Sequence, residues 1–220
     1  MKRWGQMSKT FTKIGREISK AVKDGGPNPE TNSRLRVIIQ NAKAANMPKD
    51  NIERAIKKAS DKNTESWEER VYEGYAQYGI AILVETLTDN PTRTVANVRA
   101  CFNKCDGTLG TTGSLDFAFD RKCMFKISAE GLDVEEFEFE MIDYGAEEVD
   151  LDEEENTIII YGQFQDFGNI QGALEEKDIE IMEANLERVP TDTKQLSPEQ
   201  EEEVNKLVER LEEDDDVQAV

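Results

Sequence analysis

The chain has 220 residues, with 27 Lys and Arg against 47 Asp and Glu, a formal net charge of −20 and no His. The absence of His excludes the commonest general base near neutral pH, the Ser-His and Cys-His nucleophile pairs and most zinc sites. Three cysteines without a C-x-x-C pair favour a reducing compartment, and no stretch approaches the roughly 20 apolar residues of a membrane span. We therefore expect a cytoplasmic protein without a cofactor, a metal site or a membrane partner.

Charge is distributed unevenly along the chain. Residues 1–62 carry 15 Lys and Arg and 6 Asp and Glu, a net of +9, whereas residues 63–220 carry 12 and 41, a net of −29. We call residues 1–62 the basic head. Because the rest of the chain repels nucleic acid, this asymmetry predicts local phosphate binding by the head.

Three helices are predicted in the head, over residues 8–24, residues 32–46 and a third segment that opens at Pro48. Five cations of the first helix, at spacings of 4, 3, 4 and 3, fall within an arc of about 80° opposite the apolar stripe. We call them the basic row: Lys9, Lys13, Arg16, Lys20 and Lys23. A solvated helix face is the alternative, but the unbroken row favours a phosphate-binding face.

The predicted nucleic-acid-binding residues are the basic row and the other cations of the head: Lys2, Arg3, Arg34, Arg36, Lys43, Lys49, Arg54, Lys57 and Lys58. Nothing in these helices identifies side chains that reach base edges. We therefore expect backbone contacts to duplex DNA, or to structured RNA or the ribosome, without a sequence code. Phe11 is expected to be buried, which argues against stacking on single strands.

Strands and helices are mixed beyond the head. Strands are predicted over residues 71–75 and 80–88, a helix begins at Pro91 with Asn90 as its N-cap, and a further strand follows over residues 115–119. From residue 123 the predicted order is βαββαβ, which is the ferredoxin-like arrangement. Its elements are strand 123–128, helix 133–144, strands 147–151 and 157–161, helix 166–174 and strand 179–189.

The C-terminal segment is expected to complete the middle region. Ser197 and Gln200 form a capping box for a last helix, and residues 217–220 look like a strand. The fold class is therefore α+β with three domains: a basic helical domain (1–66), a discontinuous α+β domain (67–122 plus 191–220) and a ferredoxin-like α+β domain (123–190).

Other motifs are weaker. The Gly-rich segment 107–114 lacks the Gly-Lys-Ser/Thr of a phosphate loop, and the acidic cluster 150–155 lacks the Gly of an EF-hand. Cys101 and Cys105 lie one helical turn apart without two further ligands, so we expect no metal there. If the protein were an enzyme, its polar site would have to be Asp89 beside Arg93 and Arg99, and we expect no enzyme. The remaining alternative is an adaptor that binds a protein partner through the acidic domains.

Several stretches occur together in an order and spacing typical of one family: Phe11-Thr12-Lys13-Ile14, Asn46-Met47-Pro48-Lys49-Asp50, Tyr72-Glu73-Gly74-Tyr75, Thr88-Asp89-Asn90 and Leu109-Gly110-Thr111 with Gly113-Ser114. They resemble the YebC-like proteins, described as probable transcriptional regulators, whose mitochondrial relatives are translational activators of a cytochrome oxidase subunit. The resemblance implies three domains, a cytoplasmic location and nucleic-acid binding without a catalytic centre. It favours transcriptional regulation through DNA, with ribosome-associated translational control as the alternative.

Overall fold

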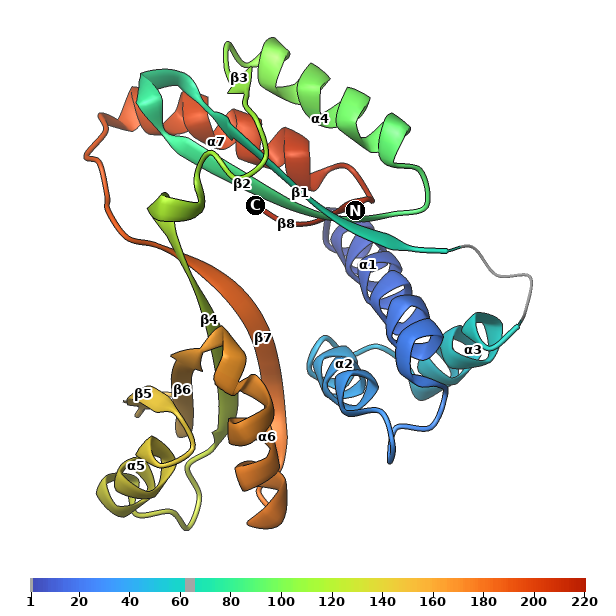
Figure 1. Ribbon diagram of the computed structural model, residues 1–220, viewed down its shortest axis with the longest axis vertical. Coiled ribbons are helices and arrows are strands. Elements are labelled where there is room, and N and C mark those ends of the chain that lie inside the picture. The colour runs from blue at the N-terminus through green and yellow to red at the C-terminus, as the bar shows by residue number, and fades with distance from the viewer. Residues whose placement is uncertain (1, 62–65) are drawn as a thin grey trace.

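The computed structural model describes residues 2–61 and 66–220, with side chains from Met7 onward. The protein is α+β, and its described residues form three hydrophobic cores, one in the head and one under each of two antiparallel sheets (Figure 1). We call the two sheet regions the middle unit (66–118 and 191–220) and the distal unit (119–190). The three predicted domain ranges stay a prediction. The predicted boundary between residues 122 and 123 lies inside strand β4, which runs continuously through residue 122.

The head consists of three helices, α1 (Lys2–Gly25), α2 (Ser33–Ala44) and α3 (Lys49–Ala59). Ile18 and Leu35, both fully buried, lie at the centre of its core. Asn32 closes the turn between α1 and α2, because its Oδ1 accepts from Leu35 N at 3.0 Å and its Nδ2 donates to Ala21 O at 2.8 Å. Helix α1 begins at Lys2, earlier than the predicted start at residue 8. The prediction starts late because the apolar pattern on which it depends begins only at Phe11.

The middle unit is a four-stranded sheet of order β3-β1-β2-β8, with α4 and α7 packed side by side on one face. The C-terminal strand pairs antiparallel with β2, so the last residues complete a sheet that begins about 150 residues earlier in the chain. Asn90 and Ser197 are the N-caps of α4 and α7, as predicted. The elements are β1 (Glu68–Tyr75), the 3-10 helix η1 (Gln77–Gly79), β2 (Ala81–Thr88), α4 (Pro91–Lys104), β3 (Thr108–Leu109), the 3-10 helix η2 (Asp116–Ala118), α7 (Pro198–Glu212) and β8 (Val217–Ala219).

The distal unit confirms the βαββαβ order, with sheet order β5-β6-β4-β7 and every neighbouring pair antiparallel. The predicted strand at 115–119 is wrong, because residues 116–118 form η2 and β4 begins at Phe119. Strand β4 starts there because β7 is equally long and pairs Pro190 with Phe119. The elements are β4 (Phe119–Ser128), α5 (Val134–Ile142), β5 (Ala146–Asp152), β6 (Thr157–Gln163), the 3-10 helix η3 (Phe164–Asp166), α6 (Phe167–Glu176) and β7 (Ile181–Pro190).

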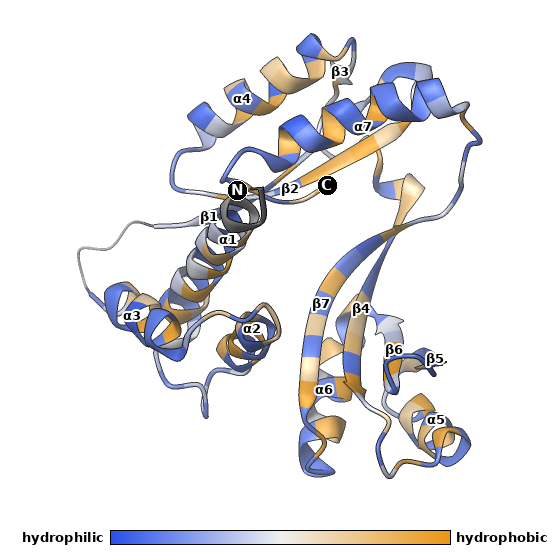
Figure 2. Ribbon diagram, turned by 180° about the vertical axis from the view of Figure 1, so that it is seen from behind, coloured by the Kyte–Doolittle hydropathy of each residue, from blue (hydrophilic) through white to orange (hydrophobic). Residues whose placement is uncertain are grey.

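The head contacts both other units. The N-terminal half of α1 lies beside the C-terminal strand, and α2 packs against β7, where Val37 joins the distal core (Figure 1). Hydrophobic colour is concentrated on β2 and on inward faces, whereas the head helices carry much polar surface (Figure 2). Over the described ranges, none of the helices has the length and apolar character to cross a bilayer.

Candidate nucleic-acid interface

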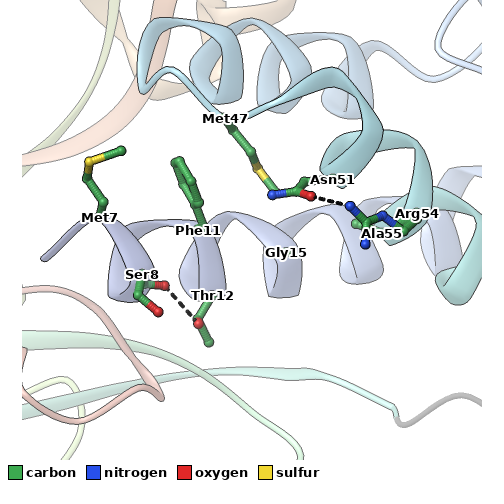
Figure 3. A pocket seen from close by; sticks show the side chains of 9 residues that line it. All are labelled: Met7, Ser8, Phe11, Thr12, Gly15, Met47, Asn51, Arg54 and Ala55. Carbon is green, nitrogen blue, oxygen red and sulfur yellow. Dashed lines mark hydrogen bonds between the residues drawn. The ribbon is translucent and has the colours of Figure 1, made fainter. Parts of the chain in front are cut away.

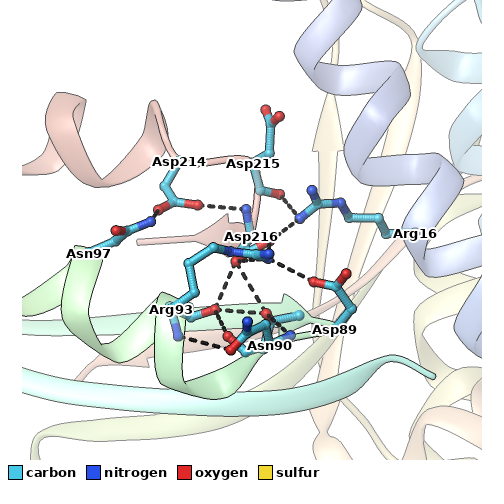
Figure 4. Close-up of polar contacts among 10 residues, drawn as sticks. Arg16, Asp89, Asn90, Arg93, Asn97, Asp214, Asp215 and Asp216 are labelled. Atoms are coloured by element: carbon cyan, nitrogen blue, oxygen red, sulfur yellow. Dashed lines mark hydrogen bonds and ion pairs between the residues drawn. The ribbon is translucent and has the colours of Figure 1, made fainter. Parts of the chain in front are cut away.

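The structure divides the basic row. Arg16, at the centre of the row, turns towards the connection between α7 and β8 (Figure 4). Its Nη1 donates to Asp216 Oδ1 at 2.5 Å and to the Asp215 carbonyl oxygen at 2.6 Å, and its guanidinium lies 4.9 Å from the ring centroid of Trp67. The charge of Arg16 is therefore balanced inside the protein, and Arg16 can reach phosphate only if this contact opens.

Asp216 is a buried carboxylate that accepts hydrogen bonds from two segments besides α1. Arg93 Nη2 donates to Asp216 Oδ2 at 2.8 Å, and the hydroxyls of Thr94 and Thr88 lie 2.8 and 3.2 Å from the same oxygen. Burial alone would raise the pKa of Asp216, but the hydrogen bonds from Arg93, Thr94 and Arg16 outweigh it and hold the pKa below its ordinary value. Arg93 also pairs with Asp89 at 2.7 Å, so the polar cluster considered for catalysis is an internally paired network.

The other members of the basic row differ in how far their side chains are engaged by ion pairs, hydrogen bonds or burial. Lys20 pairs with Asp24 at 2.9 Å, and Lys23 donates to the Asp61 carbonyl oxygen at 3.0 Å. Lys13 is half-buried, and this burial lowers its pKa although Glu212 and Asp215 act in the opposite direction. Three members of the row therefore face acidic groups of the protein itself, whereas Lys9 and Lys23 are exposed without an ion pair among the described residues.

Two arginines of α2 also pair with carboxylates outside the head. Arg36 makes a bidentate contact with Glu175 on α6, with N···O distances of 2.8 and 3.0 Å. Arg34 pairs with Glu69 on β1. Nearby, burial raises the pKa of Glu17 to about 7, with Glu69 adding to the rise and Arg34 and Lys13 opposing it. These contacts anchor α2 to both sheet units and reduce the charge that it presents to solvent.

Eight of the predicted cations are exposed, and two of these are held by other groups, Lys23 by the Asp61 carbonyl oxygen and Arg34 by Glu69. Of the other six, four lie on α3. We call these six the exposed cations: Lys9, Lys43, Lys49, Arg54, Lys57 and Lys58. Lys49 is 87% exposed and its contact with Glu53, at 3.7 Å on the same helix, is long. Arg54 donates only to the neutral acceptors Asp50 O and Asn51 Oδ1, at 3.1 and 2.7 Å, so its charge is not compensated by these bonds. For Lys2 and Arg3 the side chains lie outside the described part of the chain.

A groove of about 480 Å³ runs between α1 and α3 beside Arg54 (Figure 3). Its walls combine apolar side chains, chiefly Phe11 and Met47, with the polar pair Asn51 and Arg54. Phe11, which is expected to be buried, packs on the head core and is half-buried. The lining residues are Met7, Ser8, Phe11, Thr12, Gly15, Met47, Asn51, Arg54 and Ala55.

The Gly-rich segment binds an anion of the protein itself. The carboxylate of Glu73, 2% exposed on β1, accepts from Gly113 N at 2.8 Å and from Leu115 N at 2.6 Å. Ser114 Oγ lies 3.4 Å from the same group. Since Glu73 occupies these amide donors, the loop is a structural clasp and not a phosphate cradle.

Cysteines and acidic clusters offer no metal site in residues 2–61 and 66–220, where no group of three or more His, Cys, Asp or Glu has the required arrangement. Cys101 is directed at the Arg210 carbonyl oxygen at 3.8 Å, and Cys105 packs at the edge of the middle core. Burial raises the pKa of the Cys123 thiol to about 11.

Sequence reasoning missed the two features that shape this interface. Asp216 was visible only as part of an acidic run, although its position beside an apolar strand was a signal that it is buried. Gly15, an interior helix glycine, was a signal of open space on α1, and it lines the groove.

The comparisons with known proteins agree over the whole length. Residues 1–62 match the family model for the TACO1/YebC protein N-terminal domain, and residues 67–220 match the model for the TACO1/YebC second and third domain. A probable transcriptional regulatory protein of Flavobacterium johnsoniae is 58% identical over 220 residues, covering 100% of this chain and 92% of the relative. A protein of the same name from Porphyromonas gingivalis is 56% identical, covering 100% and 90% of the two chains.

A solved structure is also similar, that of the conserved hypothetical protein Aq1575 from Aquifex aeolicus. Its TM-score is 0.79 at 42% identity, over 97% of this chain and 88% of that chain. A similar fold is therefore known from a solved structure, and two relatives are named probable transcriptional regulatory proteins. The chain belongs to the TACO1/YebC family.

Proposed function

We propose that this protein is a cytoplasmic regulator of gene expression that binds nucleic acid through its head. The observation that carries the proposal is the split among the cations of the head: Arg16, Arg34 and Arg36 pair with acids of the other units, whereas four of the six exposed cations lie together on α3. Lysine and arginine at such a surface contact phosphates without reading sequence. The acidic units confine nucleic acid to this face and are the candidate surface for a protein partner.

Transcriptional regulation through duplex DNA is the leading form of the proposal, and the names of the relatives support it. A ribosome- or RNA-associated translation factor is the second candidate. The groove beside Arg54 favours it, because sequence-specific RNA recognition targets unstacked bases. Neither form needs a catalytic centre.

The test is a salt titration of binding, with fluorescence anisotropy on a 20-bp DNA duplex and on an RNA hairpin. If about six cations touch phosphate, the logarithm of the association constant falls with the logarithm of salt concentration at a slope of roughly −5. A triple variant, Lys49→Glu, Arg54→Glu and Lys57→Glu, should weaken binding strongly and reduce the slope by about 3.

A matched variant controls for net charge. Lys104→Glu, Lys206→Glu and Arg210→Glu change the charge equally on exposed positions of α4 and α7, and binding should be far less affected. A flat salt response, or equal effects of both triple variants, contradicts the proposal. Sedimentation of cell lysates on sucrose gradients, with and without RNase, separates the two forms, since only the translational one predicts RNase-sensitive migration with ribosomal particles.

A further inference from the structure

The groove between α1 and α3 contains space that the fold does not require. Gly15 lies inside α1, and a Cβ built on it meets nothing within 4 Å. Glycine in a helix interior is destabilising relative to alanine. Because no neighbour forbids a side chain at Gly15, the glycine keeps the floor of the groove open at a cost in stability.

The walls of the groove suit a flat aromatic ligand. The Phe11 ring stands between Met7 and Met47 in Figure 3, half-buried against the core and directed into the groove. Met7 is 37% exposed at one end. An aromatic ring and thioether side chains pack well against a planar base, and base–aromatic stacking is indifferent to base identity.

The far end of the groove is polar and cationic. Arg54 Nη2 donates to Asn51 Oδ1 at 2.7 Å, which orients the Asn51 amide and leaves its Nδ2 without a hydrogen bond among the described residues. An amide N–H beside an apolar slot can donate to a ring nitrogen or carbonyl of a base. Arg54 and Lys58 lie one turn apart on the same side of α3, where a phosphate next to the base would lie.

We propose that this groove binds an unstacked base of single-stranded nucleic acid, with Phe11 against the base, Asn51 at its edge and Arg54 at the flanking phosphate. The inference rests on the proposed function, since it assigns the kind of nucleic acid that the head binds. The positive rim selects a polyanion, and the apolar walls accept the face of a base only when it has left its stack. RNA and DNA single strands share this chemistry.

The experiment uses the full-length protein and fluorescein-labelled ten-nucleotide oligouridylate and oligodeoxythymidylate, with a 20-bp DNA duplex for comparison. Gly15→Leu fills the groove with a good helix former, Gly15→Ala leaves most of it open, and Lys57→Glu changes the charge outside it. Gly15→Leu should weaken single-strand binding at least fivefold and leave duplex binding within twofold, whereas Gly15→Ala should bind as the wild type does. Circular dichroism and thermal melting verify that all three variants fold.

The outcomes are distinguishable. If Lys57→Glu weakens binding of all three probes and Gly15→Leu weakens none, the groove proposal is overturned and the proposed function stands. If no probe binds in a salt-dependent way, the proposed function itself fails, and this inference fails with it. A selective loss on Gly15→Leu supports the groove, and a preference for uridylate over deoxythymidylate then assigns its occupant to RNA.

Discussion

The side-chain amide of Asn41 pairs with the backbone of Ala184 as a neighbouring strand would. Its Nδ2 donates to Ala184 O at 2.8 Å and its Oδ1 accepts from Ala184 N at 2.9 Å. Ala184 lies on β7, the edge strand of the distal sheet, whose outer backbone groups would otherwise lack a ladder. A single residue of α2 thus joins the head to the distal unit and covers part of an open sheet edge.

Asn41→Ala should lower the free energy of unfolding by about 1–2 kcal/mol, because it leaves the N–H and C=O of Ala184 unpaired in a half-buried place. Urea denaturation measures the loss. Gln40→Ala, one residue earlier on α2, removes a comparable side chain that makes no hydrogen bond within the described part of the chain, and serves as the control. Equal effects of the two substitutions would show that the Asn41 contact contributes nothing.

Asp216→Asn should cost roughly 2–3 kcal/mol, since it leaves Arg16 and Arg93 without their shared carboxylate. The pKa of Asp216 is below its ordinary 3.8, so its ionised form stabilises the fold above that pH, and this contribution is lost as pH falls through the folded-state pKa. The difference between wild type and variant should therefore shrink in acid. Lys20→Ala, which breaks only the Lys20–Asp24 pair on α1, is the control. If the difference in stability between wild type and Asp216→Asn persists unchanged at low pH, the role of the charge is refuted.

The raised pKa of Glu17 predicts a pH dependence of stability opposite to that of Asp216. Its pKa is raised to about 7 from 4.5, so between these values the folded state holds a proton that the unfolded state has released. Stability should fall as pH rises from 4.5 to 7, by up to ~3 kcal/mol. In Glu17→Gln this fall should be absent and the protein should be more stable at pH 8, as measured by urea unfolding across the range. Glu30→Gln, at an exposed position before α2, should keep the wild-type profile; identical profiles for all three proteins would contradict the assignment.

Glu73→Gln should loosen the Gly-rich loop, because a neutral amide offers one acceptor oxygen where the carboxylate serves both Gly113 N and Leu115 N. We expect a loss of ~1–3 kcal/mol and faster amide hydrogen exchange in residues 110–115. Glu68→Gln, on the same strand but exposed and bonded to Arg70, is the control. Unchanged exchange in the loop would show that Glu73 does not hold it.

Local pattern was sufficient for much of the fold. Asn90 and Ser197 cap the helices that their positions indicate, and the order of predicted strands and helices beyond residue 123 indicated the ferredoxin-like arrangement. Such features depend on neighbours a few residues away. The strand at 115–119 was misplaced because the start of β4 depends on the length of β7, about 70 residues later.

The candidate site was harder to predict for the same reason. Helical periodicity placed Arg16 on a cationic face but could not identify Asp216 as its partner, 200 positions away in the chain. It also marked Phe11 as apolar without showing that its side chain lines a groove. Sequence therefore locates the charges of the head, whereas the tertiary structure decides which of them are already neutralised.

The pairing of Arg16, Arg34 and Arg36 with acids of the other units has an effect at long range. Each pair cancels a positive and a negative charge where the head meets the acidic units, whereas four of the exposed cations lie on α3, so the exposed positive charge of the head gathers on that helix. A polyanion would turn such a molecule during diffusion, before any contact forms. The exposed face of α3 is then the one that arrives first, at a rate that depends on ionic strength.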